Sequence, residues 1–218
     1  MRRRRSVTTL ASVLLAAAVP FTTVGAQGVQ RPAGFTVIVD PGSRDTVAHT
    51  AMPPGWHMTT GPGALLFDPS FRASGRYTID AEIFLFPGKS QSGYGIFVGG
   101  QNLDGTSPRY LTFVIRRDGQ AALQYTSGAD IQSLLPWASA AAIRLESGKE
   151  EPVLNTLSLA VGPDSIVASV NGQRVGAVSA STLDLQGAFG FRVGPDVNLH
   201  ASKLDIRQHL APAPTAKK

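Results

Sequence analysis

Polar and apolar residues alternate along most of this chain, and this period of two limits its fold more than any other feature. In residues 77–85 every second residue is apolar or aromatic, and the positions between them include Thr78, Asp80 and Glu82. Such alternation is typical of a β-strand with one buried face and one exposed face. No segment after residue 26 shows the spacing of an amphipathic helix. The chain is therefore expected to be all-β.

Many short segments share this pattern and end at Gly, Pro, Asn or Asp. The predicted strands are residues 35–39, 56–60, 64–67, 76–86, 94–99, 110–117, 120–126, 156–161, 165–171, 174–178, 188–193 and 198–207. Short strands separated by tight turns are typical of a sandwich or barrel. Several of them offer one core face and one polar face, as two stacked antiparallel sheets require. We therefore predict a two-sheet antiparallel β-sandwich.

Turn sequences connect these segments. Asp118-Gly119 and Asn171-Gly172 each predict a two-residue hairpin turn, because a type I′ turn needs positive φ at both positions. Gly162-Pro163-Asp164 predicts a further turn. Residues 131–142 break the pattern and are expected to form a loop or one short helix. Apolar residues from four strands are expected to be buried: Phe113, Leu123, Leu157, Leu159, Phe189 and Phe191.

The first 26 residues have the features of an export signal. Arg2–Arg5 are basic, residues 10–21 form an apolar run of 12 residues, and Val24-Gly25-Ala26 resembles a cleavage site. A membrane-spanning helix needs about 20 apolar residues, so we interpret residues 1–26 as a cleaved signal peptide. The protein is then expected to be exported, periplasmic or extracellular, with no stable membrane insertion. Arg4-Arg5 leave open whether it uses the twin-arginine or the general route.

The remaining chain is expected to form one domain. We predict a flexible N-terminus over residues 27–34, the sandwich over residues 35–207, and a disordered Pro/Ala-rich tail over residues 208–218. Hydrophobic residues make up 43% of the chain, which is enough for a core, and there is no cysteine. The missing cysteines exclude a disulfide scaffold, thiolate metal sites and a Cys nucleophile.

Net charge argues against nucleic acid as a partner. Four of the 20 Lys and Arg residues lie in Arg2–Arg5, so the mature chain has 16 of them against 15 Asp and Glu residues. The longest basic run after the signal is Arg116-Arg117, and Asp118 follows it directly. Nucleic-acid binding usually requires a clear basic excess. The oligomeric state is left open.

The order of strands and turns in the second half resembles a known superfamily. A strand ending in Val170-Asn171-Gly172, a return strand and the run Gly187-Ala188-Phe189-Gly190-Phe191 are similar to the C-terminal half of concanavalin A-like, laminin-G-like jelly rolls. Residues 77–82 and 94–100 resemble the secreted bacterial family named for 3-keto-disaccharide hydrolases. The resemblance implies a concanavalin A-like jelly roll and a carbohydrate partner, and it transfers no catalytic residue to this chain.

Jelly rolls of this superfamily often carry calcium. The chain has no dense Asp/Asn loop for that ion. Its nearest oxygen-rich segment, Asn102-Leu103-Asp104-Gly105, is interpreted as a simple turn. The four histidines are scattered and form no zinc-ligand pair with the usual spacing. We therefore expect no metal and no cofactor, with calcium left as an alternative that no motif supports.

One pair of carboxylates has a spacing that suits catalysis. Asp80 and Glu82 share a strand face and lie about 6.5–7 Å apart at Cα by the rise of a strand. Two carboxylates at such a separation serve as acid and base in glycoside hydrolysis. The alternative is that both are solvated residues beside a basic neighbour such as Arg116. The laminarinase-type motif Glu-x-Asp-x-x-Glu and the GxSxG elbow are absent.

Other polar residues are candidates for binding a ligand. Arg116, Gln124 and Arg192 project away from the predicted core, and we expect them to share a shallow groove with Asp80 and Glu82. Trp137 or His57 is expected at its rim. Trp137 is either a platform for a sugar ring or a residue that packs its loop onto the sandwich. His57 is either a ligand contact or a surface histidine without a role.

Three functions remain open at this point. The first is an exported, non-catalytic carbohydrate-binding protein, favoured by the absence of a catalytic motif. The second is a glycoside hydrolase-like enzyme that acts on glycosides, disaccharides or their 3-keto derivatives, as the family resemblance implies. The third is a structural or protein-interaction sandwich without a small ligand.

Overall fold

The computed structural model describes residues 35–41 and 47–209. The predicted signal peptide, the flexible segment 27–34 and residues 210–218 of the predicted tail lie outside the described residues. None of the described residues belongs to a helix long and apolar enough to cross a membrane.

Within the described residues the structure is built from strands and turns alone. The strands are β1 (Thr36–Val39), β2 (Val47–Ala51), β3 (Trp56–Thr60), β4 (Ala64–Phe67), β5 (Arg72–Ala73), β6 (Arg76–Leu85), β7 (Tyr94–Gln101), β8 (Arg109–Ile115), β9 (Gln120–Ser127), β10 (Asp130–Ser139), β11 (Val153–Val161), β12 (Ser165–Val170), β13 (Gln173–Ser179), β14 (Gly187–Val193) and β15 (Asn198–His209).

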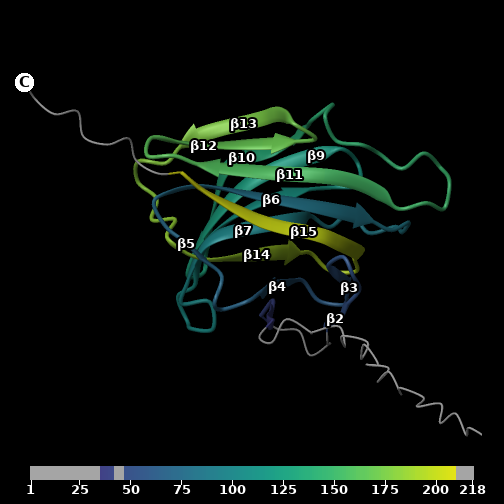
Figure 1. The fold of residues 1–218 in the computed structure, drawn as a ribbon, viewed down its shortest axis with the longest axis horizontal. Helices are drawn as coiled ribbons and strands as arrows, with labels where there is room; N and C mark the ends of the chain where they lie inside the picture. The colour runs from purple at the N-terminus through teal and green to yellow at the C-terminus, as the bar shows by residue number, and fades with distance from the viewer. Residues whose placement is uncertain (1–34, 42–46, 210–218) are drawn as a thin grey trace, which may run out of the picture.

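These strands form two stacked antiparallel sheets, as predicted (Figure 1). The eight-stranded sheet has the order β1-β4-β14-β7-β8-β9-β10, with β5 paired to β14. The seven-stranded sheet has the order β13-β12-β11-β6-β15-β3-β2. Sequential hairpins account for only part of the pairing, since β14 lies between β4 and β7, and β15 lies between β6 and β3.

The core fills the space between the two sheets. In β6, the odd-numbered residues from Tyr77 to Leu85 point inward and are at most 3% exposed. The six core residues predicted from alternation are also at most 3% exposed. The period of two therefore identified the inner faces of β6, β8, β9, β11 and β14 correctly, because side chains of a strand with one buried and one exposed face must alternate.

The prediction of a loop or short helix over residues 131–142 is wrong, because β10 occupies most of that segment. β10 pairs with β9, with register shifts between Ser133 and Leu135 and between Leu135 and Ala138. Pro136 lies between these positions and has no N–H to donate to a ladder. β10 is the edge strand of its sheet, where such an interruption is tolerated.

Two further predictions about local structure need correction. Asp118-Gly119 does connect a hairpin, but four residues separate β8 from β9 and only Gly119 has positive φ, so the turn is not type I′. β15 runs to His209, two residues beyond the predicted end of the domain, and the His209 ring lies 2.9 Å from the Thr78 hydroxyl. Asn171-Gly172 forms the predicted turn, with φ of 50° and 78°.

Candidate functional site

The seven residues predicted to form one site lie on the outer faces of two different sheets. Three of them belong to the seven-stranded sheet: His57, Asp80 and Glu82. Four belong to the eight-stranded sheet or follow directly from one of its strands: Arg116, Gln124, Trp137 and Arg192. The core of the sandwich separates the two faces, so the prediction of one shared groove is wrong. Alternation identifies the outer face of each strand but not the sheet that the strand joins.

Asp80 and Glu82 have hydrogen-bond partners on β15, and neither lies beside Arg116 as expected. Asp80 accepts hydrogen bonds from Nε and Nη2 of Arg207, at 2.9 and 2.8 Å. Glu82 accepts a hydrogen bond of 3.3 Å from the hydroxyl of Ser202. Neither carboxylate lines the pocket beside β5 or the smaller pocket beside Gly75 and Gly162. Their predicted roles as acid and base stay a prediction.

His57 lies opposite His200 of β15 on the same outer face. Its ring packs edge-on against Phe86, with ring centres 5.1 Å apart. Nε2 of His200 lies 2.9 Å from the carbonyl oxygen of Pro54, so this nitrogen must be the protonated donor. His57 therefore belongs to an aromatic cluster on the outer face of the seven-stranded sheet, opposite the face that holds Arg116, Gln124, Trp137 and Arg192.

Arg116 and Trp137 do lie together. The guanidinium carbon of Arg116 lies 3.7 Å from the centre of the Trp137 ring, a cation–π contact. The ring edge also fills the space beside Gly93, where an added Cβ would lie 3.0 Å from Cη2. Both predicted uses of Trp137 remain consistent with this geometry, although Arg116 already occupies one ring face.

The other two predicted residues of this sheet are placed differently. Arg192 forms a bidentate ion pair with Asp40, with Nη1–Oδ1 at 2.5 Å and Nη2–Oδ2 at 2.7 Å. This pair fastens the end of β1 to β14. Gln124 is half-buried on β9, opposite Thr112 of β8 and Ser133 of β10.

A hollow lies elsewhere on the eight-stranded sheet, beside β5, whose position Figure 1 shows. This end pocket has a volume of about 920 Å³ and is formed by segments far apart in sequence. It is bounded by β1, by the chain from β4 to β5, by the loop after β7, by the start of β8 and by the segment leading into β14. None of the seven predicted residues lines it.

Apolar side chains form the floor of the end pocket. Ile38, Phe67, Leu103 and Ala188 line it and belong to a second apolar cluster, on the outer face of the sheet. Phe67 packs edge-on against Phe97, with ring centres 5.7 Å apart. A side chain at Gly100 would collide with Leu103 and Phe97, at 2.9 Å from each, so the glycine permits this close packing.

Polar side chains form its rim. Gln101 donates from Nε2 to Asp184 Oδ2 (2.9 Å) and to the carbonyl of Gln186 (2.8 Å). Its Oε1 accepts a hydrogen bond of 2.7 Å from Nη2 of Arg109. Hydrogen bonds from Gln101 and from the Gln186 N–H hold the pKa of Asp184 below its usual value, and Arg109 acts in the same direction. Arg72, Asn102 and Asp104 complete the polar lining.

The wall of the pocket is anchored in the core. The hydroxyl of Tyr77, a fully buried side chain, donates a hydrogen bond of 2.6 Å to the carbonyl of Leu185. Asp184 and Gln186 flank this residue and present their polar groups to the pocket. A rigid core contact therefore positions the part of the rim that carries the carboxylate. The Gly99-Gly100 and Asn102-Gly105 sequences were the only local signals of this site.

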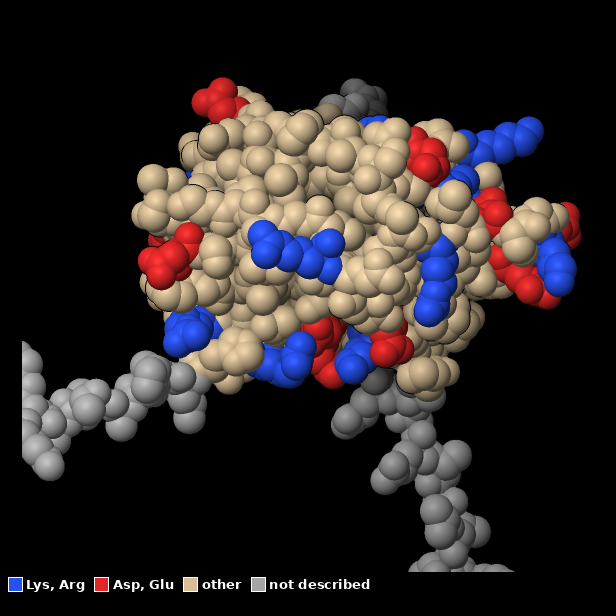
Figure 2. All heavy atoms as spheres, turned by 90° about the horizontal axis from the view of Figure 1, so that it is seen from above, with Lys and Arg blue, Asp and Glu red and all other residues tan. Residues whose placement is uncertain are grey.

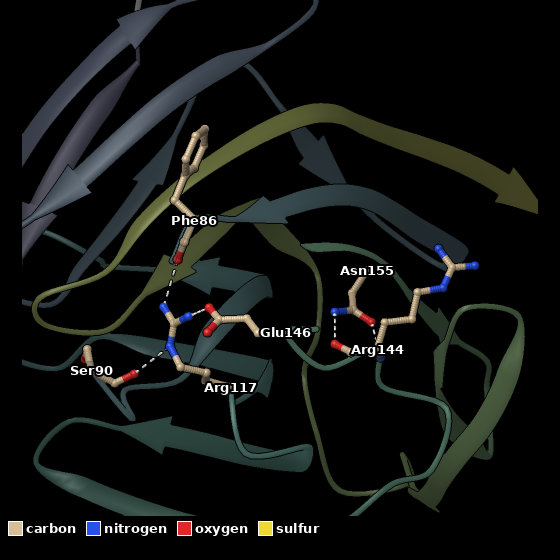
Figure 3. A network of polar contacts seen from close by, with 6 residues as sticks. All are labelled: Phe86, Ser90, Arg117, Arg144, Glu146 and Asn155. Atoms are coloured by element: carbon tan, nitrogen blue, oxygen red, sulfur yellow. Dashed lines mark hydrogen bonds and ion pairs between the residues drawn. The ribbon is translucent and has the colours of Figure 1, made fainter. Parts of the chain in front are cut away.

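A second polar network lies away from the end pocket and connects loops (Figure 3). Arg117 donates to the carbonyls of Phe86 (2.9 Å) and Ser90 (3.3 Å) and pairs with Glu146. Burial lowers the pKa of Arg117, and the side chain is only 11% exposed. All three partners of Arg117 fix connections between strands, so we interpret this network as structural.

Charged side chains are sparse in the middle of the edge formed by β13 and β10. Figure 2 shows this edge from above, with one basic group near the middle, most other charged groups around the margin, and no continuous patch of one sign. Both signs gather at the end where the chain between β10 and β11 projects. In the described part of the chain, no three His, Asp or Glu side chains lie close enough to share a metal ion.

Comparison with known proteins supports the fold but does not identify a family or a function. No family model matches the chain, and no curated protein matches its sequence. The carbohydrate-binding module CBM66 from Bacillus subtilis has a TM-score of 0.62 and 10% identity, and the match covers 80% of this chain and 96% of the module.

Two other solved structures are similar in the same way. A GH16 protein from the mixed-linkage glucan PUL of Bacteroides ovatus has a TM-score of 0.56 and 13% identity, covering 80% of this chain and 94% of that protein. A Bacillus subtilis protein of unknown function with a galectin-like fold has a TM-score of 0.55 and 11% identity, covering 80% and 89% of the two chains. The chain is thus a jelly-roll β-sandwich of the concanavalin A-like and galectin-like type. The narrower resemblance to the 3-keto-disaccharide hydrolase family stays a prediction.

Proposed function

We propose that this protein is an exported, non-catalytic carbohydrate-binding protein whose ligand occupies the end pocket. The observation that carries the proposal is the combination of an apolar floor with the Arg109–Gln101–Asp184 rim. Sites for small ligands are usually apolar hollows with a few fixed polar groups that orient the ligand. A sugar presents C–H faces to such a floor and hydroxyl groups to such a rim.

The charges of the pocket favour a neutral ligand. Its lining holds two guanidinium groups, Arg72 and Arg109, and two carboxylates, Asp104 and Asp184. The formal charges cancel, so neither an anionic nor a cationic ligand is attracted overall. The pocket volume of about 920 Å³ is near the upper end of the range typical of ligand sites, which suits more than one sugar unit. The similar fold of a carbohydrate-binding module supports the same proposal.

Isothermal titration calorimetry with a panel of neutral oligosaccharides tests this proposal. The panel contains gluco-, xylo-, manno- and fructo-oligosaccharides of two to four units. Arg109→Ala is expected to weaken binding of the best ligand roughly tenfold to hundredfold, because hydrogen bonds to a charged donor are lost. Arg207→Ala is the matched control, since this arginine is also exposed and paired but lies on the other sheet.

Two outcomes contradict the proposal. One is that no member of the panel binds, and the other is that both arginine variants weaken binding equally. Incubation of each ligand with the protein, followed by product analysis, tests the non-catalytic part. Export is tested by the intact mass of secreted material, which should begin near Gln27.

A further inference from the structure

One side chain, Gln101, holds the polar rim of the end pocket together. Its two N–H groups donate to Asp184 and to the carbonyl of Gln186, and its oxygen accepts from Arg109. A primary amide has two donors and one acceptor oxygen. These three bonds therefore use both donors and leave only one lone pair, so Gln101 itself has little capacity to bind a ligand.

Arg109 and Asp184 keep most of their capacity. Arg109 donates one hydrogen bond to the described residues, and a guanidinium has five N–H groups. Asp184 accepts one bond on each oxygen, from Gln101 at 2.9 Å and from the Gln186 N–H at 3.2 Å, and each oxygen has a further lone pair. Because both residues bind the same amide, a donor group and an acceptor group stand next to each other at the rim.

We propose that Gln101 is a positioning residue that orients Arg109 and Asp184 to bind two adjacent hydroxyl groups of a sugar, a vicinal diol. This inference rests on the proposed function. One hydroxyl accepts a hydrogen bond from Arg109, and its neighbour donates one to Asp184. A hydroxyl group can do either, whereas a guanidinium only donates and a carboxylate only accepts. The pair therefore selects for two hydroxyls on neighbouring carbons.

The inference requires an amide at position 101, and this requirement has a distinctive pH signature. In Gln101→Glu, the carboxylate still accepts from Arg109 but cannot donate to Asp184, and two like charges then face each other. Such pairs raise the pKa of one member. Arg109 on β8 and Arg72 on β5 oppose this rise, and Asp104 in the loop after β7 adds to it. Protonation of Glu at position 101 restores a donor toward Asp184.

The experiment uses the full mature chain and the strongest ligand of the neutral panel. Gln101→Glu is expected to bind roughly tenfold to hundredfold more weakly at neutral pH and to recover affinity as the pH falls to about 4.5. Gln101→Met is expected to be weak at both pH values. The wild type is expected to change little over this range, because its Asp184 stays ionised. Gln132→Met, an exposed position on β10 of the same sheet, is the matched control.

Monodeoxy derivatives of the methyl glycoside of the preferred unit test the diol directly. Removal of either hydroxyl of one adjacent pair is expected to weaken wild-type binding roughly tenfold or more, with smaller effects elsewhere on the ring. The inference is overturned if Gln101→Glu fails to recover at low pH while circular dichroism shows it folded, or if all hydroxyls matter equally. If the wild type binds no oligosaccharide, the proposed function fails and the inference falls with it.

Discussion

Asn155 is the clearest case of a residue whose role comes from its hydrogen bonds. Its side chain is fully buried. Oδ1 accepts from the backbone N–H of Arg144 at 2.8 Å, and Nδ2 donates to the carbonyl of Arg144 at 3.0 Å (Figure 3). Oδ1 also accepts from Nδ2 of Asn171 at 2.8 Å. Asn171 also donates to the carbonyl of Ala142 at 2.8 Å. The two amides therefore fasten the connection between β10 and β11 to the β12–β13 turn.

Replacing Asn155 with Ala is expected to lower the free energy of unfolding by about 2–3 kcal/mol, because buried backbone groups of Arg144 lose their partners. Urea denaturation measures the change. Asn198→Ala is the matched control, since this asparagine makes a surface hydrogen bond of 3.3 Å with Thr59. It is expected to cost less than about 1 kcal/mol. Equal losses in the two variants would contradict a structural role for the Asn155 network.

The β12–β13 hairpin shows how an element depends on backbone conformation alone. Asn171 and Gly172 both have positive φ, at 50° and 78°, as a type I′ turn requires. Apart from Gly172 and its two chain neighbours, no atom of the described residues lies within 4 Å of the position that a Cβ on Gly172 would occupy. Any penalty for a side chain there must therefore come from the left-handed conformation and not from a collision.

Gly172→Val is expected to lower the free energy of unfolding by about 1–2 kcal/mol, the usual penalty for a left-handed L-residue, or somewhat more because valine is branched. Gly172→Asn should lose clearly less, since asparagine tolerates positive φ. Urea denaturation of both variants checks the order. A loss in Gly172→Asn as large as that in Gly172→Val would show that space, and not φ, controls this turn.

At the scale of the whole molecule, two buried tyrosines make the stability of the folded sandwich depend on pH. Tyr77 and Tyr94 are at most 1% exposed. Burial raises the pKa of Tyr94 to about 12, against an ordinary value of 10.0. The pKa of Tyr77 is raised too, by burial and by the negative charge of Asp184. Both groups therefore stay neutral in the folded protein at pH values where they ionise in the unfolded chain.

The folded protein is thus expected to lose stability as the pH rises from 10 to about 12, the window set by the pKa of Tyr94. Below pH 10 the phenols are neutral in both states and add no pH dependence. Within the window each tyrosine contributes a slope of about 1.4 kcal/mol per pH unit. Urea denaturation across this range should show a smaller slope for Tyr94→Phe. Leu123→Val, a core change without a titrating group, should lower stability and leave the slope unchanged.

Local periodicity was sufficient to predict most strands, their inner faces and the Asn171-Gly172 turn. These features depend on residues close together in sequence, since a strand alternates by its own geometry. β10 was not predicted as a strand because Leu134, Leu135 and Pro136 break the alternation of its apolar residues. Pairing with β9, which the sequence of β10 alone does not reveal, makes it a strand.

The sequence by itself determined that this chain forms an all-β sandwich with a defined core. Only the tertiary structure decided which outer faces meet. Asp80 and Arg116 both project away from the core, yet they lie on opposite sheets because β6 pairs with β11 and β15 while β8 pairs with β7 and β9. The end pocket joins residues from Thr36 to Ala188 for the same reason. Strand partners are chosen by contacts between segments far apart in the chain, and alternation contains no information about those partners.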